Sequence, residues 1–549
     1  MPPPGRRTSY LAWTVLVLAI AVSVWVRLRL LNFPLERDEG EYAYAGQLIL
    51  EGIPPYQLVY NMKMPGTYLG YAAIMALCGQ TPAGIHLGLI VVHLASLGVL
   101  FLLARKFLGL SGAAIATSAY ALMTLSPSFL GLAAHATHFV LLPALLGSWM
   151  LLRFERTRRW IDCFASGCFF GIAFLMKQPG LLFGIFGGLY LTWLCVQERF
   201  FPASANAPTL TKLTWRDWVL RLGSFVAGCV LPFVLVCAWL KEAGVFPQFW
   251  FWTISYAREY ASIMTLAQGW VNAKYIFTGI FMAAPALWVL AAAGLVLLSS
   301  VGMEANKRVF LAGFFIFSFL SVCPGYYFRN HYFILLVPAV ALLIGLVPSW
   351  GESRLLKARS QSQYLPLAIG ALACAQSLYR DRQVLFVLPP LEACRAVYFT
   401  NPFPESLEIA RYIEQNTRQD ERIVVIGSEP QIYFYAHRRS STGYIYTYPL
   451  MEPQPFAKRM QEEMIREIEQ NPPAYLVFVS IPTSWLEQTG SSHLLLDWAR
   501  GYVEQHMQVS GLIQFTGAQT TESAWGADAA RTHLHSTLFV SIFKRADIP

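Results

Sequence analysis

Residues 32–66 read NFPLERDEGEYAYAGQLILEGIPPYQLVYNMKMPG, and the rest of the chain is organised around this stretch. It follows a long apolar run and is too polar to cross a bilayer, with its carboxylates concentrated in residues 36–41. Lys63 stands alone just before Pro65 and Gly66, where the next apolar segment begins. An acidic cluster at a membrane surface, followed by one cation, indicates chemistry on a lipid-borne substrate that carries phosphate.

The composition is that of a polytopic membrane protein. Hydrophobic residues make up 55% and charged residues 13% of the 549 residues, and several apolar runs approach the roughly 20 residues that span hydrocarbon. The net charge of +9 comes from cations in short loops, so it gives no reason to expect nucleic acid as a partner. The nine cysteines lack metal-ligand spacing, which argues against a disulfide framework.

Loop charges predict how the helices are oriented. Lys and Arg favour the cytoplasmic side of short loops, which places Arg6 and Arg7 inside and the loop 32–66 outside. If the short segment 67–80 lies in the outer interface, we expect eleven spans and a long outer loop at 241–271. If 67–80 crosses instead, the basic clusters that follow it change sides, so both topologies stay open.

The composition changes near residue 395. We therefore expect a transmembrane catalytic domain at 1–394 and a small extracytoplasmic α/β domain at 395–549. Helical and strand patterns alternate in this second part. The expected helices lie at 404–417 and 455–470, and the expected strands at 422–427, 474–480 and 536–543.

Asp38 and Glu39 are the first candidates for chemistry. A carboxylate at headgroup height can accept a proton from an attacking hydroxyl or amine, and the amphipathic helix expected at 39–51 would lie along the membrane surface. The alternative is structural, because an aspartate at this position can cap the helix that begins near Glu39.

Cations on the predicted outer side form the second group of candidates. Lys63, Lys177, Arg258 and Arg329 all lie on the side that short basic loops avoid. Together they favour a phosphate site, because a phosphodiester leaving group needs fixed positive charge as its bond breaks. The alternatives are lysines that extend to the headgroups and, for Arg258, the stabilisation of an interfacial helix.

Histidines form the third group. His135 and His138 are spaced to share a helical face, and with His331 they could hold a metal ion. A metal site needs a complete ligand set, and no further ligand is evident, so hydrogen-bonding roles are favoured over a metal.

Motifs in three regions of the chain carry a resemblance to a known family. The sequences RDEGEY, GIPPY and NMKMPG in the first outer loop, KQPG at 177–180 and YFRNHYF at 327–333 resemble family 39 glycosyltransferases. These are GT-C enzymes, similar to the protein O-mannosyltransferases and to the bacterial aminoarabinose transferase for lipid A. The resemblance covers about residues 10–380.

The resemblance implies a polyprenyl-phosphate sugar donor and an inverting transfer. Asp38 falls at the position of the catalytic base, Glu39 at its acidic neighbour, and Lys63 where relatives hold the lipid phosphate. Many relatives have an acid in the second outer loop, where this chain has His135-Ala136-Thr137-His138. That difference leaves a divalent metal and a second carboxylate open.

The sequence is therefore interpreted as a membrane glycosyltransferase of a cell envelope, expected in the bacterial inner membrane. Asp38 is the expected base, and the expected phosphate ligands are Lys63, Lys177 and Arg329, with His331 as a further donor. The acceptor can be a lipid, a glycan or a protein. Two alternatives are a flippase of a lipid-linked sugar, which would place charges at mid-bilayer, and a membrane-anchored binding protein, which would need a recognisable site in 395–549.

Overall fold

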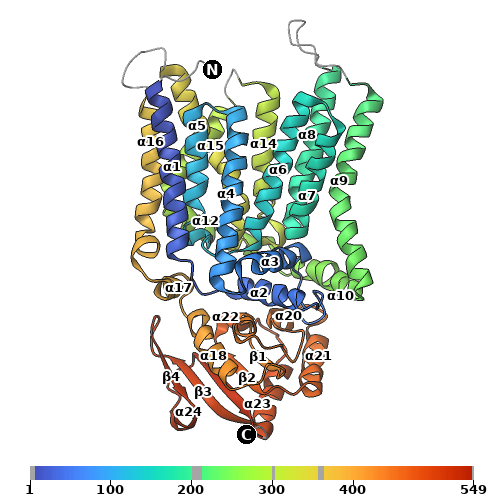
Figure 1. Cartoon of the computed structure of the whole chain (residues 1–549), viewed down its shortest axis with the longest axis vertical. Helices are drawn as coiled ribbons and strands as arrows, with labels where there is room; N and C mark the ends of the chain where they lie inside the picture. Colours follow the sequence, from blue (N-terminus) through green and yellow to red (C-terminus); the bar gives the residue numbers. More distant parts are fainter. Residues whose placement is uncertain (1–5, 201–212, 300–302, 356–363, 547–549) are drawn as a thin grey trace.

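Two bodies lie one above the other along the long axis of the molecule. The computed structural model describes residues 6–200, 213–299, 303–355 and 364–546. Figure 1 shows a bundle of long helices with the N-terminus at its far end, and a C-terminal sheet with its helices at the opposite end. A thin layer of short helices separates the two.

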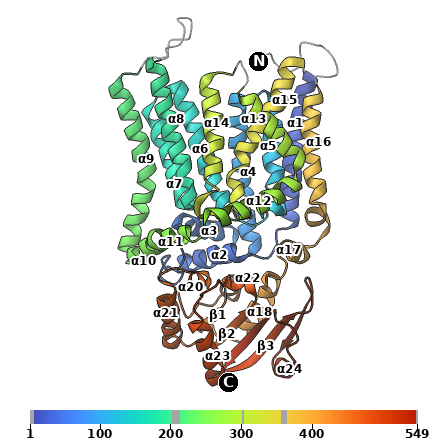
Figure 2. The ribbon, with the colours of Figure 1, turned by 180° about the vertical axis from the view of Figure 1, so that it is seen from behind.

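The bundle consists of apolar helices that run along the long axis (Figures 1 and 2). They are α1 (Arg6–Arg29), α4 (Pro82–Phe107), α5 (Leu110–Met123), α6 (Ala136–Thr157), α7 (Trp160–Met176), α8 (Leu181–Phe200), α9 (Trp215–Glu242), α13 (Pro285–Leu298), α14 (Ala305–Leu320), α15 (Val337–Leu355) and α16 (Leu365–Arg380). Among the described residues, five helices are long and apolar enough to cross a membrane, or six if one bent pair counts as a span. A helical membrane protein is confirmed, while the count of eleven spans stays a prediction.

The segment between α9 and α14 differs most from expectation. The predicted outer loop 241–271 is largely helical, with α10 (Phe246–Trp250), a π-helical turn at Phe251–Tyr256, α11 (Ala257–Ser262) and the start of α12 (Leu266–Ala283). The next predicted span is not straight, because α12 and α13 meet at 105°. The break falls at Ala284-Pro285, and proline cannot continue the hydrogen bonding of the preceding helix. Figure 2 shows α12 across the lower end of the bundle.

The separating layer contains most of residues 32–66 and the segment that follows them. Helices α2 (Arg37–Leu50) and α3 (Pro65–Cys78) lie across the end of the bundle (Figure 1). The transverse position of α3 agrees with the interfacial placement of 67–80. Helix α2 was expected on the membrane surface, but most of its residues are buried, because the C-terminal part of the chain covers it.

The C-terminal part folds around a five-stranded mixed sheet in the order β1-β2-β5-β3-β4. Strands β1 and β2 are parallel, and the other neighbours are antiparallel. The expected helices and strands are present, whereas β3 and β4 were not expected. The strands are β1 (Ile423–Ile426), β2 (Tyr475–Ser480), β3 (Met507–Phe515), β4 (Thr521–Trp525) and β5 (Phe539–Arg545), and the helices are α18 (Phe403–Gln415), α19 (Gln431–Ala436), α20 (Tyr448–Met451), α21 (Ala457–Gln470), α22 (Pro482–Trp485), α23 (Leu494–His506) and α24 (Ala527–Arg531). The predicted boundary at 394/395 falls inside α17 (Pro390–Tyr398).

Two hydrophobic cores follow a different division from the predicted domains. One core fills the helical bundle. The other joins Tyr42, Tyr44 and Leu48 of α2 to Val424 and Ile426 of β1, so the layer and the sheet share one core. We refer to residues 403–546 as the C-terminal unit.

Candidate active site

A cavity of about 500 Å³ lies between the end of the bundle and the C-terminal unit. The layer contributes Asp38 and Lys63 to its wall, and the loop before α15 contributes Arg329 and His331. The C-terminal unit contributes Tyr446 and other side chains. Asp38 and Tyr446, which are 408 residues apart in sequence, therefore meet at one site.

Asp38 lies in the first turn of α2 and faces this cavity. Glu36 is the N-cap: its side chain accepts from the Glu39 amide, while Glu39 accepts from the Glu36 amide, which completes a capping box. The capping role considered for Asp38 is therefore filled by Glu36, and Asp38 is left free for other contacts. Its Oδ1 accepts from Lys63 Nζ at 2.9 Å and from the Tyr446 hydroxyl at 2.9 Å.

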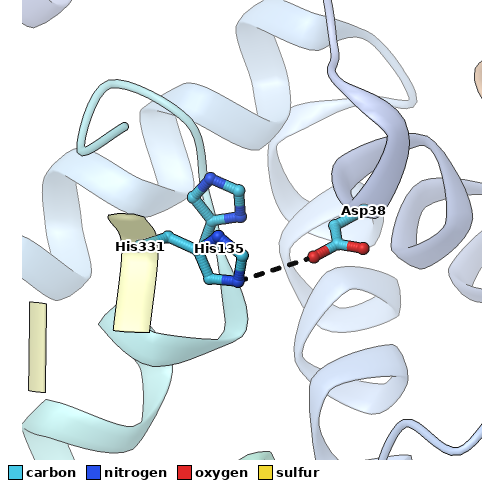
Figure 3. A group of neighbouring side chains, drawn as sticks. All are labelled: Asp38, His135 and His331. Atoms are coloured by element: carbon cyan, nitrogen blue, oxygen red, sulfur yellow. Dashed lines mark ion pairs between the residues drawn. The ribbon is translucent and has the colours of Figure 1, made fainter. Parts of the chain in front are cut away.

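Charge in the cavity keeps Asp38 ionised. Burial alone would raise the pKa of Asp38, but the positive charge of Lys63 outweighs burial and holds that pKa well below its usual range. The Nε2 atom of His331 lies 3.8 Å from the Oδ2 of Asp38. Asp38 is thus a carboxylate at neutral pH, with one oxygen hydrogen-bonded and the other directed toward a histidine (Figure 3).

Glu39 is not brought to the cavity. Its side chain is fully buried, and its Oε1 accepts from the Ala134 amide at 2.6 Å and lies 3.1 Å from His86 Nε2. These contacts join α2 to α4 and to the segment before α6. The geometry gives Glu39 a structural position, which differs from its expected place beside the base.

The expected phosphate ligands occupy three kinds of position. Lys63 is paired with Asp38. Lys177 and Arg329 have no acidic partner within ion-pair distance in the described part of the chain. Lys177 Nζ lies 4.1 Å from the ring centroid of Tyr332, and Tyr332 lines the cavity. The Arg329 guanidinium lies over the ring of Tyr327. Arg258 is exposed on α11 and is not among the described residues that line the cavity.

Lys177 can gain or lose its proton near neutral pH. Burial, reinforced by the nearby positive charge of Lys63, lowers the pKa of Lys177 to about 7. The charge of Lys63 reaches Lys177, but of these two lysines only Lys63 is among the described residues that line the cavity, so a phosphate site shared by both stays a prediction.

His135 and His331 form a stacked pair beside Asp38. Their ring centroids are 4.2 Å apart and their planes differ by 12°, and Figure 3 shows both rings on one side of the Asp38 carboxylate. His135 is the N-cap residue of α6 rather than a residue on its face. His138 therefore does not join it: the group that could hold a metal ion is Asp38, His135 and His331.

The C-terminal unit supplies side chains that sequence reasoning missed. Tyr446, Tyr448 and Glu452 line the cavity, and Glu452 accepts a 2.5 Å hydrogen bond from Tyr256. Burial raises the pKa of Glu452 to about 7. The only local signal is the tyrosine-rich run GYIYTYP at 443–449, which gives no indication that it packs against Asp38.

Residues 63–206 match the family model of the dolichyl-phosphate-mannose-protein mannosyltransferases, a segment that includes Lys63, His135 and Lys177. The structure resembles ArnT from Cupriavidus metallidurans bound to undecaprenyl phosphate, with a TM-score of 0.58 and 14% identity over 97% of this chain and 98% of that one. The resemblance to GT-C glycosyltransferases is confirmed.

Two further structures share this GT-C fold. The oligosaccharyltransferase AglB from Archaeoglobus fulgidus, in complex with an inhibitory peptide and a dolichol-phosphate, has a TM-score of 0.55 and 14% identity, over 95% of this chain and 75% of that one. The arabinofuranosyltransferase AftD from Mycobacteria has a TM-score of 0.51 and 14% identity, over 99% of this chain and 42% of that one. At these identities the likeness concerns the fold. No curated protein matches the chain.

Proposed function

We propose that this GT-C chain is a membrane glycosyltransferase that moves a sugar from a polyprenyl-phosphate donor to an extracytoplasmic acceptor, with inversion. The observation that carries the proposal is the cavity itself, where an ionised carboxylate, Asp38, lies beside the partly buried cations Lys63 and Arg329, with Lys177 behind the cavity-lining ring of Tyr332. An ionised base and fixed positive charge are the two requirements of a transfer that expels a phosphate.

Asp38 would act as the general base. The acceptor hydroxyl or amine gives its proton to Oδ2 of Asp38 while its heteroatom forms a bond to the anomeric carbon. The bond from that carbon to the phosphate oxygen breaks on the opposite side, and the electron pair leaves with the lipid phosphate. A single displacement of this kind inverts the configuration, so a β-linked donor yields an α-linked product.

The cations would divide into two roles. Lys63 donates to Asp38 Oδ1 at 2.9 Å, so its first role is to hold the base rather than the phosphate. Lys177 and Arg329, which have no acidic partner among the described side chains, are the principal phosphate ligands, with His331 as a further donor. In a dry site, removing one such donor costs about a hundredfold or more in rate.

Asp38, His135 and His331 fit a divalent cation as an alternative to the base role of Asp38, because a coordinated Oδ2 could not accept a proton. Their ligand atoms lie within 4.8 Å of one another. Burial lowers the pKa of His135 to about 4, so its ring is neutral, and neither ring nitrogen makes a hydrogen bond although the ring is buried. A bound cation would supply further positive charge near the leaving phosphate. Metal analysis of the purified protein and of His135→Ala, with His138→Ala as control, tests this assignment.

The direct test uses purified protein in lipid nanodiscs, offered polyprenyl-phosphate sugars and membrane acceptors, with products identified by mass. Asp38→Asn keeps the shape and loses proton acceptance, so transfer should fall about 10²–10⁴-fold while donor binding persists. Glu39→Gln is a poor control for this test because Glu39 joins the layer to the bundle. Glu41→Gln is the better control. Glu41 lies on the next turn of α2 and accepts hydrogen bonds from Tyr68 and Asn61. An active Asp38→Asn enzyme would eliminate the proposed base. Movement of the intact lipid across the bilayer, without transfer, would favour the flippase instead.

We further propose that residues 395–549 form an extracytoplasmic domain and that the protein resides in a bacterial inner membrane. The basic helix ends, such as Arg105-Lys106 of α4 and Arg354 of α15, support this orientation. They lie at the end of the bundle opposite to the C-terminal unit (Figure 1).

A further inference from the structure

A loop of the C-terminal unit reaches the carboxylate proposed as the base. The Tyr446 hydroxyl donates to Oδ1 of Asp38 at 2.9 Å, and the Tyr446 side chain lines the cavity. Lys63 donates to the same oxygen. Two donors on Oδ1 fix the plane of the carboxylate and leave Oδ2 free of hydrogen bonds from the described residues. Oδ2 is therefore the oxygen available for an incoming proton.

The loop that carries Tyr446 is held on both sides. The Thr447 amide donates to Ser428 Oγ at 3.0 Å, and the Thr447 hydroxyl donates to the Ser484 carbonyl at 3.0 Å. On the other side, the Tyr60 amide donates to the Gly443 carbonyl at 2.8 Å. The Tyr446 hydroxyl is thus placed by packing and hydrogen bonds rather than by chance contact.

The neighbours of Asp38 are tied to the same unit. Arg37 Nη2 donates to Glu429 at 2.7 Å, with the Glu429 side chain fully buried. At Gly40, an added Cβ would lie 2.5 Å from the Gln431 amide nitrogen, so the close approach of α2 to α19 requires glycine there. Three positions of the motif, Arg37, Asp38 and Gly40, therefore face the C-terminal unit.

We propose that Tyr446 is a positioning residue for Asp38, and that the C-terminal unit thereby completes the catalytic centre. This inference rests on the proposed function and deepens it, because it gives the C-terminal unit the task of setting the orientation of the base. Without the Tyr446 hydroxyl, the carboxylate is held by Lys63 alone and can turn about its Cβ–Cγ bond, so fewer encounters present Oδ2 to the acceptor.

The kinetic test is Tyr446→Phe, which removes only the hydroxyl. We expect kcat to fall about tenfold to a hundredfold, as for a lost hydrogen bond to a charged group, with the donor KM nearly unchanged because the phosphate ligands are intact. The matched control is Tyr444→Phe on the same loop, whose hydroxyl donates to Glu463 outside the cavity lining. Wild-type kcat in Tyr446→Phe, or an equal fall in Tyr444→Phe, would overturn the inference.

A second measurement does not depend on activity. Thermal unfolding of Tyr446→Phe, Asp38→Asn and the double variant forms a thermodynamic cycle, and residues in direct contact give non-additive shifts. Additive shifts would overturn the contact and with it the positioning role. A wild-type protein that transfers no sugar, yet shows non-additive shifts, would contradict the proposed function alone.

Discussion

At the scale of single residues, the cations in and near the cavity differ in whether they already have an acidic partner. Lys63 has its charge matched by Asp38, whereas Lys177 is buried against a tyrosine ring and has a pKa lowered to about 7. A bound phosphate would face Lys177 as its missing counter-charge. Donor binding should therefore be coupled to proton uptake by this one side chain.

We expect donor affinity to depend on pH through Lys177. Below pH 7 the lysine is already charged and binding has its full strength. A bound phosphate raises the pKa of Lys177, so above pH 7 donor binding requires Lys177 to take up a proton. Donor affinity therefore falls by up to about tenfold per pH unit, until the pH reaches the pKa that Lys177 has in the complex. A glycosyl phosphodiester lacks the second ionisation of a phosphate monoester, near pH 6, and does not confuse the measurement.

The matched variant for this experiment is Lys177→Arg, which stays charged at every working pH. Its donor affinity, measured by titration calorimetry in nanodiscs, should stay level where that of the wild type declines. Groups whose charge reaches Lys177 are Lys63, Asp38, Arg329 and Glu36. Equal slopes in the two proteins would assign the pH dependence to one of those groups.

Local motifs predicted some of these residues and could not predict others. Asp38 and Lys63 were identified because both belong to one short outer loop. The structural position of Glu39 has a local signal, since Glu36 and Glu39 have the spacing of a capping box, but its partners His86 and Ala134 lie in other segments. Tyr446 lies 408 residues beyond Asp38, and no periodicity in one sequence relates such distant positions.

At the scale of elements, α2 is the helix on which both bodies converge. Its N-terminal turn presents Asp38 to the cavity, its buried tyrosines pack into the core of the sheet, and Glu39 joins it to the bundle. Helix α2 therefore cannot shift toward one body without losing contacts to the other. This arrangement explains why a helix with three acids in its first turns and a fourth at its N-cap is buried rather than surface-bound.

Gly40→Ala should disturb this convergence. The new methyl group would meet backbone atoms of Gln431 at 2.5–2.8 Å, and overpacking of this kind costs about 1–3 kcal/mol. We expect a lower Tm and a fall in kcat, because Asp38 moves relative to Tyr446. Gly70→Ala on α3 is the matched control: a Cβ there meets nothing within 4 Å, so it should be neutral or stabilising by up to about 1 kcal/mol. A Tm for Gly40→Ala at or above that of Gly70→Ala would contradict the close approach.

The break between α12 and α13 shows how a sequence pattern can mislead. The run from Leu266 to Leu298 is mostly apolar, with Lys274 as its one charged residue, so hydropathy favours a single span. Pro285 marks the break, yet helices α6, α9 and α15 contain internal prolines without breaking. Whether a proline kinks or ends a helix depends on the packing around it, which hydropathy does not describe.

At the scale of the whole molecule, the site lies at one end of the bundle, and the basic ends of α4, α6, α8 and α15 lie at the other (Figure 1). We expect the C-terminal unit to be extracytoplasmic. A reporter that is active only in the cytoplasm should therefore be silent when fused after residue 549, and active when inserted in the segment 201–212 between α8 and α9. The opposite pattern would place the cavity on the cytoplasmic side and exclude an extracytoplasmic acceptor.

The ion pair between Arg37 and Glu429 has a consequence for how the protein is made. Its two partners are 392 residues apart. Because translation adds about 5–20 residues per second, Glu429 is synthesised roughly 20–80 s after Arg37. During that interval the bundle can insert, but the buried face of α2 has no sheet to cover it. The motif that carries the proposed base is thus among the first segments to be synthesised and among the last to be buried.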